Sequence, residues 1–364
     1  MELLVHQARF VLVVALLAAC TSRNERAIPA ADSSAARAVS ARDTSRTLLY
    51  VSNEDSRNIS LIDPATDSVI ATIEVGMRPR GVKVSPDGRT VYVALSGSPK
   101  CPPTMPDAEC AKKVADRSQD GVAVVDVATR KTTKVLPAGI DPETFDVSAD
   151  GRTLYVSNED AGTLSIVDVA SGKVTTDVRT GREPEGVTIA PDGKTVWVTG
   201  ETDHNVTVVD VGSGKSLAQI DTKGKRPRAV GFLPDGSKAY VTNEQSGTVA
   251  VIDPAARTVR GSITLPDGAK PMGVAVADDG SRIYVSTGRG GEVVVIDPKR
   301  DSVVASVKVG QRPWGIALSA DGNTLYSANG PGNDVSVVDT KSMAVVRHVP
   351  VGSVPWGVAI GAKP

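Results

Sequence analysis

Histidine is scarce in this chain of 364 residues, which contains three: His6, His204 and His348. His6 lies in an apolar N-terminal stretch and His348 in a segment predicted to be an outer strand, which leaves His204 for chemistry. Neither a three-ligand metal site nor a histidine-assisted nucleophile cluster can be assembled from one histidine. We therefore expect no cofactor and no catalytic residues, and the sequence predicts that the protein is not an enzyme.

Charge of one sign and long apolar runs are also lacking. The chain has 41 basic and 42 acidic residues, a net charge of −1, so it has no basic surface of the kind that nucleic acids require. The apolar run at residues 10–19 is too short to span a bilayer. It follows Arg9, and residues 1–19 are predicted to be a signal peptide.

The end of that stretch, Leu17-Ala18-Ala19-Cys20, resembles the lipobox of bacterial lipoproteins. The resemblance implies that Cys20 is acylated, and Thr21 after it implies the outer membrane, facing the periplasm. An ordinary signal that happens to contain Cys20 is the alternative. Residues 20–46 are rich in Ala, Ser and Arg without any strand or helix period, which predicts a disordered tether and membrane contact through the lipid anchor only.

A repeat of fixed length dominates the rest of the chain. An aromatic residue recurs in short β-branched runs, at Tyr50, Tyr92, Tyr155, Trp197, Tyr240, Tyr284 and Tyr326. A proline recurs in the same way, at Pro79, Pro142, Pro184, Pro227, Pro271, Pro313 and Pro355. Each unit contains four short segments with strand composition separated by turn residues, for example Thr248–Asp253 and Met272–Ala277. Units of this length and composition are typical of a β-propeller.

We therefore predict an all-β fold for residues 47–364, a seven-bladed β-propeller of four-stranded antiparallel blades. The chain enters at a second strand and leaves at a first strand. Pairing of the C-terminal first strand with the N-terminal second strand would complete one blade and hide both free edges. The second unit alone is longer, and its extra residues form a predicted insertion loop at 96–120.

The insertion contains the two remaining cysteines, Cys101 and Cys110, in the stretch "KCPPTMPDAEC". An exported protein meets oxidising conditions, so we predict that these cysteines form a disulfide. A thiol pair that binds metal is the alternative. The loop is interpreted as a lid or docking loop, with a neutral surface insertion as the other interpretation.

The residue after each repeated proline is predicted to begin the innermost strand, at the mouth of the central channel. These candidate ligand-binding residues are Arg80, Glu143, Glu185, Arg228, Met272, Trp314 and Trp356. Two adjacent blades contribute an acidic arc, which consists of Asp141, Glu143, Glu159, Glu183, Glu185 and Glu201. Arg78 and Arg80 flank the arc on one side, and Arg226 and Arg228 flank it on the other.

Two interpretations of this mouth remain open. Carboxylates at one end and indoles at the other suit a small amphiphilic or cationic ligand. Alternatively, the arginines and glutamates satisfy one another and the tryptophans fill the channel. Oxygen ligands of the arc would also suffice for Ca²⁺, against which stand solvated or arginine-paired carboxylates.

The repeat "AYVTNEQSGTVAVIDP" (residues 239–254) resembles that of the YVTN-repeat propellers. Stretches such as "DPETF", "EPEGV" and "VPWGVAI" resemble a periplasmic subgroup that accompanies alcohol oxidation dependent on pyrroloquinoline quinone. The resemblance implies a lipid-anchored binding or scaffolding module, accessory to that pathway, with a quinone-dependent dehydrogenase or its cytochrome as partner.

Residues 227–244 also look like the repeat of the seven-bladed lactonase propellers. Those usually carry a histidine after the Pro-Arg pair, where this chain has Ala229. A lactonase-like hydrolase is therefore the alternative function, beside a sensor for a small ligand or cation.

Overall fold

The computed structural model describes residues 47–100, 105–110 and 112–362, apart from the side chains of Asp107, Cys110 and Ala362. The predicted signal peptide, the acylated Cys20 and the tether lie outside these residues, as does the predicted disulfide, which needs Cys101 and the Cys110 side chain. In the described part, no helix has the length and apolar character needed to cross a membrane.

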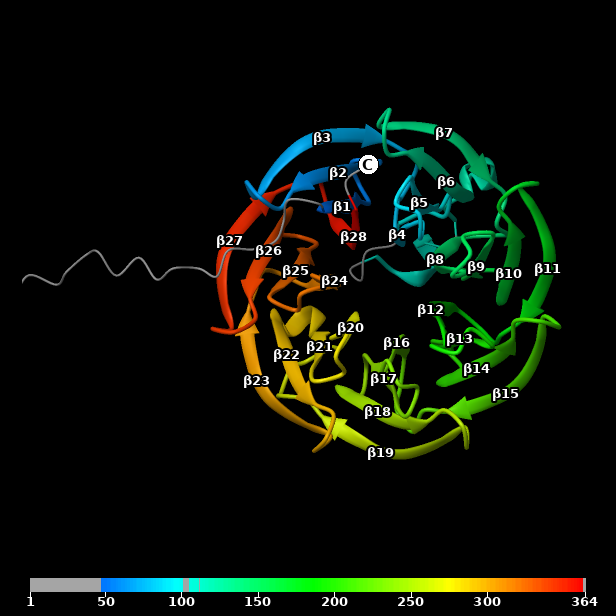
Figure 1. Ribbon diagram of the computed structural model, residues 1–364. Helices are drawn as coiled ribbons and strands as arrows, with labels where there is room; N and C mark the ends of the chain where they lie inside the picture. Colours follow the sequence, from blue (N-terminus) through cyan, green and yellow to red (C-terminus); the bar gives the residue numbers. More distant parts are fainter. Residues whose placement is uncertain (1–46, 101–104, 111, 363–364) are drawn as a thin grey trace, which may run out of the picture. The chain divides into compact units, whose positions relative to one another are not determined.

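The described strands form seven antiparallel sheets of four strands, arranged as blades around a central channel (Figure 1). Blade 1 is β28 (Pro355–Ala362), β1 (Thr47–Asn53), β2 (Asn58–Asp63) and β3 (Ser68–Glu74). Blade 2 is β4 (Val82–Val84), β5 (Thr90–Leu95), β6 (Gly121–Asp126) and β7 (Lys131–Leu136). Blade 3 is β8 (Pro142–Val147), β9 (Thr153–Asn158), β10 (Thr163–Asp168) and β11 (Lys173–Arg179).

The remaining blades repeat this order from the channel outward. Blade 4 is β12 (Pro184–Ile189), β13 (Thr195–Gly200), β14 (Asn205–Asp210) and β15 (Lys215–Asp221). Blade 5 is β16 (Pro227–Phe232), β17 (Ala239–Asn243), β18 (Thr248–Asp253) and β19 (Thr258–Thr264). Blade 6 is β20 (Val274–Val276), β21 (Ile283–Ser286), β22 (Glu292–Asp297) and β23 (Ser302–Lys308). Blade 7 is β24 (Pro313–Leu318), β25 (Thr324–Asn329), β26 (Asp334–Asp339) and β27 (Ala344–Pro350).

The predicted closure of the ring is confirmed. Strand β1 pairs antiparallel with β28 on one edge and with β2 on the other, and the register aligns Leu49 with Ile360 and Val51 with Val358. Blade 1 is therefore built from both ends of the described chain, and β1 is not left as a free edge.

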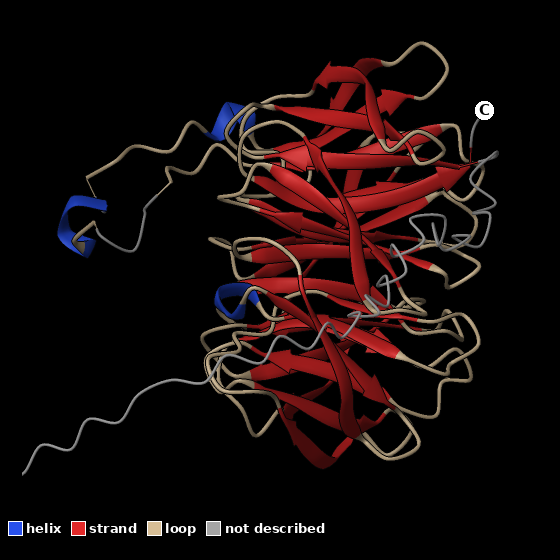
Figure 2. Cartoon of the chain, turned by 90° about the vertical axis from the view of Figure 1, so that its left-hand side faces the viewer, coloured by secondary structure: helices blue, strands red, loops and turns tan. Residues whose placement is uncertain are grey.

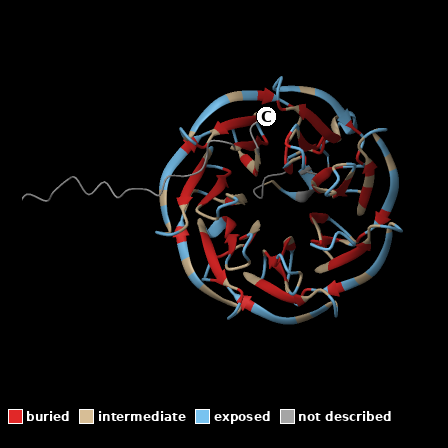
Figure 3. Cartoon of the chain, viewed as in Figure 1, coloured by how far each residue is buried: buried red, intermediate tan, exposed pale blue. Residues whose placement is uncertain are grey.

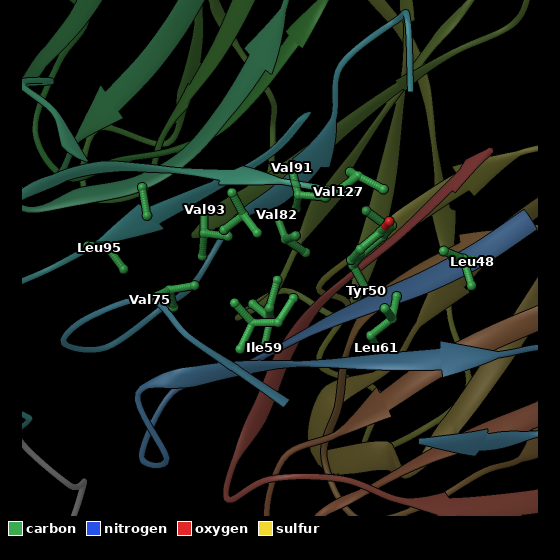
Figure 4. Close-up of a cluster of buried hydrophobic side chains, with 14 residues drawn as sticks. Leu48, Tyr50, Ile59, Leu61, Val75, Val82, Val91, Val93, Leu95 and Val127 are labelled. Atoms are coloured by element: carbon green, nitrogen blue, oxygen red, sulfur yellow. The ribbon is translucent and has the colours of Figure 1, made fainter. Parts of the chain in front are cut away.

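Each contact between neighbouring blades holds its own hydrophobic cluster, seven in all among the described residues. Between blades 1 and 2, Tyr50, Ile59 and Leu61 pack against Val82 and Val93 (Figure 4). The two middle strands of a blade are buried on both faces, whereas the outermost strands are exposed along most of their length (Figure 3). The β-branched runs in the sequence are these doubly buried middle strands.

Two inner strands are shorter than the repeat predicts. The segment expected to form a strand at Met272–Ala277 pairs only over Val274–Val276 (β20), and β4 is equally short. In blade 3, by contrast, the loop proline pairs with the last residue of the second strand, as Pro142 does with Asn158. Blades 2 and 6 have a different turn after the second strand, so this pairing is absent there.

The turns that follow the second strands of blades 2 and 6 contain all three short helices of the described chain. These are α1 (Asp107–Cys110) and η1 (Arg117–Gln119) in blade 2, and η2 (Gly288–Gly290) in blade 6. All three lie on one face of the ring (Figure 2). The insertion between β5 and β6 rises on the same face as the blade 6 turn.

Removal of residues 355–364 tests whether the closing strand holds the ring together. Without β28, the first strand loses one of its two hydrogen-bonded neighbours and blade 1 keeps only three strands. We expect loss of the cooperative thermal transition in circular dichroism and aggregation in size-exclusion chromatography. Removal of residues 363–364 is the control. A monomeric truncated protein with unchanged melting would show that closure does not depend on β28.

Candidate functional site at the channel mouth

The loops that carry the repeated prolines have an unusual backbone. Six of the seven residues that precede these prolines have positive φ: Arg78 42°, Asp141 57°, Glu183 51°, Arg226 58°, Arg312 51° and Val354 54°. Residues other than glycine seldom adopt this conformation, and a β-branched residue such as Val354 is an outlier there. Strained backbone of this kind persists only where its surroundings enforce it, and it is concentrated at functional sites.

Hydroxyl groups of the second strands hold the mouth residues in place. Ser157 Oγ donates a hydrogen bond to the backbone carbonyl of Glu185 in the next blade, at 2.6 Å. Equivalent bonds run from Ser52 to Arg80, from Thr199 to Arg228, from Thr242 to Met272 and from Ser286 to Trp314. The Ser or Thr that recurs in each "YVSN" or "YVTN" run thus fixes the main chain of a mouth residue one blade further round.

Glycine after the mouth residue lets the inner strands approach one another. A Cβ on Gly273 would lie 2.7 Å from the carbonyl oxygen of Trp314, and one on Gly315 would lie 2.6 Å from that of Trp356. Such contacts are too close for any side chain. The inner strands therefore meet closely around the channel because these positions lack a side chain.

Arg80 is the centre of the first ion-pair group. Its guanidinium forms an ion pair with Glu143, and its Nη1 lies 3.5 Å from Asp141 Oδ1 and 3.2 Å from Glu159 Oε2. Arg78 joins the group through Glu54, since its Nη2 lies 2.9 Å from Glu54 Oε1. The Arg80 side chain is only 7 % exposed, so these carboxylates replace the water that a buried guanidinium would otherwise need.

Arg228 is the centre of the second group, on the other side of the acidic arc. It forms an ion pair with Glu185, its Nη1 lies 2.7 Å from Glu201 Oε2, and its Nη2 lies 2.8 Å from Glu244 Oε2. Arg226 pairs with Glu201 as well. Three carboxylates thus surround one buried guanidinium, which leaves an excess of negative charge around Glu185.

That excess acts on two carboxyls. Burial, together with the charge and hydrogen bond of Glu201, raises the pKa of Glu185 to about 8 although Arg228 opposes the shift. Burial, with the charges of Glu185 and Asp141, raises the pKa of Glu159 to about 7 against the effect of Arg80. Both carboxyls therefore exchange protons near neutral pH, where ordinary glutamates are fully ionised. A pair of this kind in a concave site is characteristic of acid–base chemistry.

The channel below these groups is a cavity of about 180 Å³ with a mostly apolar wall. Glu185, Arg228, Met272, Trp314 and Trp356 line it, so five of the seven predicted mouth residues face one space. The indoles of Trp314 and Trp356 lie 5.5 Å apart with an interplanar angle of 35°. Neither indole is fully buried, so the tryptophans line the cavity without filling it.

Arg80 and Glu143, the other two predicted residues, are buried and paired with one another at the edge of the mouth. Glu183 belongs to the predicted arc but not to the ion pairs, because it accepts a hydrogen bond from Thr202. The arrangement therefore combines both interpretations of the sequence: the arginines are satisfied by carboxylates, and a cavity remains beside them.

Sequence reasoning missed Glu54 and Glu244, which complete the two groups. Both occupy the turn position of Glu159 and Glu201, directly after the second strand, so the repeat carried the signal. The described residues contain no cluster of three or more His, Cys, Asp or Glu arranged to hold a metal ion. His204 lies on the mouth face as expected, with Nδ1 2.9 Å from the carbonyl oxygen of Glu201.

The fold and this channel define a seven-bladed β-propeller with a cavity at the mouth of its channel. Residues 107–191 match a family model described as YNCE-like beta-propeller, and residues 191–343 match one described as Lactonase, 7-bladed beta-propeller. No curated protein matches the chain.

Solved structures share the fold. Hydrazine synthase of Kuenenia stuttgartiensis is 24 % identical with a TM-score of 0.69, over 80 % of this chain and 92 % of that one. A protein of unknown function from Desulfotomaculum acetoxidans is 16 % identical with a TM-score of 0.71, over 87 % and 99 %. A Bacteroides uniformis protein, proposed to be a 6-phosphogluconolactonase, is 16 % identical with a TM-score of 0.70, over 86 % and 99 %.

The expectation that the protein is not an enzyme is wrong. The lactonase model that matches residues 191–343 is named for an enzyme activity, and two structural neighbours, each 16 % identical, are proposed to be 6-phosphogluconolactonases. The expectation relied on the lack of histidine. Buried carboxyls such as Glu159 and Glu185 can exchange protons near neutral pH without an imidazole, and this property depends on packing that no single motif reveals.

Replacement of Arg228 by methionine tests the second ion-pair group. The change leaves Glu185, Glu201 and Glu244 buried without their cation, and we expect a loss of about 3–5 kcal/mol in the free energy of unfolding at neutral pH. Without the guanidinium, the pKa of Glu185 rises further above its unfolded value, and the pKa of Glu244, which Arg228 helps to hold below its usual range, rises as well, so the folded state gains protons that the unfolded state releases. The loss is therefore greatest at neutral and higher pH and shrinks toward about pH 5.

The measurement is urea unfolding of wild type and Arg228→Met across this pH range. Arg260→Met is the matched control, because Arg260 pairs with Asp253 on the outer surface and its loss should cost less than about 1 kcal/mol. Equal losses for the two variants, or a loss independent of pH, would contradict the described role of Arg228.

Proposed function

We propose that the protein is a hydrolase that opens a small cyclic ester at the channel mouth. The observation that carries the proposal is Glu185, a residue that lines the cavity and whose carboxyl group touches the guanidinium of Arg228 and has a pKa raised to about 8. The match of residues 191–343 to the lactonase model supports the same reaction class.

The chain supplies the groups that such a hydrolysis requires. Ionised Glu185 accepts a proton from a water molecule while the oxygen of that water attacks the ester carbonyl carbon. When the ring carbon–oxygen bond breaks, Glu185 returns the proton to the departing alkoxide, and the product is a hydroxy acid. One carboxyl thus serves as base and then as acid, a role that usually contributes about 10²- to 10⁴-fold in rate.

The surroundings of Glu185 fit this role. Arg228 lines the same cavity, and its guanidinium, which touches Glu185, would favour the negative charge that develops on the carbonyl oxygen. The apolar wall, with Met272 and the two tryptophans, suits the carbon skeleton of a ring-sized substrate. Glu159 is 28 % exposed and interacts with Glu185, so it offers a path for protons to solvent.

This site differs from the one that the lactonase resemblance implies, because Ala229 stands where those repeats usually carry a histidine. In the proposed reaction Glu185 performs the proton transfers instead. The predicted role beside quinone-dependent alcohol oxidation stays a prediction, as do the export and the lipid anchor.

Replacement of Glu185 by glutamine tests the reaction. With a panel of five- and six-membered lactones, we expect Glu185→Gln to lower kcat/KM by about 10²-fold or more. In wild type, kcat/KM should rise with pH through about 8, because the base must be ionised. Glu201→Gln removes a charge that raises the pKa of Glu185, so its profile should move to lower pH with turnover retained.

Glu74→Gln is the matched control, because Glu74 is exposed on the outer strand β3. It should leave both the rate and the pH profile unchanged. Absence of turnover across the lactone panel, or full activity in Glu185→Gln, would exclude the proposed reaction.

A further inference from the structure

Arg312 occupies the mouth opposite the acidic arc. It precedes Pro313 at the start of blade 7, and its side chain is neither fully buried nor fully exposed. Its guanidinium carbon lies 4.6 Å from the ring centroid of Trp314, so the cation is stacked on an indole that lines the cavity. Its backbone has a φ of 51°, as in the other proline loops.

Two other arginines occupy the same loop position, and both have carboxylate partners. Arg78 Nε donates a hydrogen bond to Glu54 Oε1 at 2.9 Å. Arg226 pairs with Glu201 of the preceding blade and with Glu244 of its own blade. In each case the carboxylate comes from a turn that directly follows a second strand.

The turns on either side of Arg312 carry glycine at that position. Gly330 N–H donates to the carbonyl oxygen of Arg312 at 3.3 Å, as Glu244 N–H does to that of Arg226 at 2.8 Å. Gly330 is therefore the structural equivalent of Glu244. In blade 6, Gly288 follows Thr287 as Glu244 follows Asn243. Both turns that could supply a carboxylate to Arg312 lack one.

Within the described part of the chain, Arg312 accordingly forms no ion pair. The charged residue of blade 6 that acts on it is another cation, Arg289. Burial, and then the charge of Arg289, lowers the pKa of Arg312, while the charges of Glu244 and Glu54 oppose this effect. Arg312 remains a cation, but its surroundings leave part of its charge uncompensated.

We propose that Arg312, stacked on Trp314, is a binding site for the anionic group of a small ligand, a carboxylate or a phosphate next to an apolar portion. Stacking occupies the face of the guanidinium and leaves its N–H groups, which lie in the plane, free to bind two oxygens at once. The apolar portion would lie against Trp314 and Trp356 in the cavity.

The site gives the mouth two unlike sides. Carboxyls gather around Glu185 on blades 3 to 5, whereas Arg312 and Arg289 form the cationic side on blades 6 and 7. A ligand with one anionic end would therefore enter in one orientation, with that end away from the acidic arc. Binding of the anion does not depend on hydrolysis, so it can be measured even with molecules that contain no ester.

Calorimetric titration of the full-length protein tests the site with three probes that share a cyclohexyl ring. Cyclohexanecarboxylate and cyclohexyl phosphate are the anions, and neutral cyclohexanecarboxamide is the reference. We expect at least one anion to bind about 10- to 100-fold more tightly than the amide, since a hydrogen bond to a charged group contributes on this scale. The better of the two anions identifies the class of ligand.

Two variants should abolish this preference. Arg312→Gln removes the cation. Gly330→Glu adds a carboxylate at the position equivalent to Glu244, which pairs with Arg226 in blade 5. A Cβ at Gly330 meets no atom closer than 3.8 Å, so the second variant should melt as the wild type does. Gly261→Glu is the control, because Gly261 lies on the exposed outer strand β19 with no atom within 4 Å of an added Cβ.

The expected result is that Gly261→Glu retains the preference for anions and that the other two variants lose it. The proposal is overturned if neither anion binds more tightly than the amide, or if Arg312→Gln and Gly330→Glu bind the anions as wild type does. A failure of lactone turnover would leave the outcome of these titrations unaffected, so the two proposals can fail separately.

Discussion

The antiparallel pairing of β1 with β28 is the contact on which the rest of the molecule depends. Each blade contributes one residue to the mouth, and these residues are roughly 40 or more positions apart along the chain. Only a closed ring brings them together. Closure also places Trp356, on the last strand, beside Trp314 of blade 7, and it lets Ser52 near the start of the described chain hold the backbone of Arg80.

The arrangement of charged groups in the mouth depends on this closure, because the closed ring brings the arginines and carboxylates of different blades together. A guanidinium buried as deeply as that of Arg80 or Arg228 needs carboxylates around it, because the loss of hydration would otherwise be too costly. The turns that follow the second strands supply some of those carboxylates, in blades 1, 3, 4 and 5, and the proline loops and inner strands of blades 3 and 4 supply the others. Their number exceeds what two arginines require, so Glu159 and Glu185 keep protons near neutral pH. Turns without a glutamate leave Arg312 with its charge uncompensated.

Much of this could be predicted from the sequence, because the repeat is regular. Fixed steps between the aromatic residues and the prolines predict the blades, the closure and the mouth residues such as Arg80 and Glu185. The shortness of the inner strands β4 and β20 could not be predicted. It depends on the turns that follow the second strands of blades 2 and 6, where the loop proline does not pair with the second strand. Ion pairing needs the relative position of neighbouring blades, so the roles of Glu244 and Gly330 emerge only in three dimensions. The sequence indicated a lactonase-like hydrolase only as the alternative, because a raised carboxyl pKa is a property of packing.

The account rests on carboxyls that retain protons near neutral pH inside the mouth. The most direct test is a pH titration by NMR of protein with ¹³C-labelled glutamate carboxyl groups, with Glu159→Gln and Glu185→Gln to assign the signals. Two resonances are expected to titrate at about 7 and about 8, one missing from each variant. If every glutamate carboxyl titrates below about 5, as ordinary glutamates do, the mouth holds no such protons and the account is contradicted.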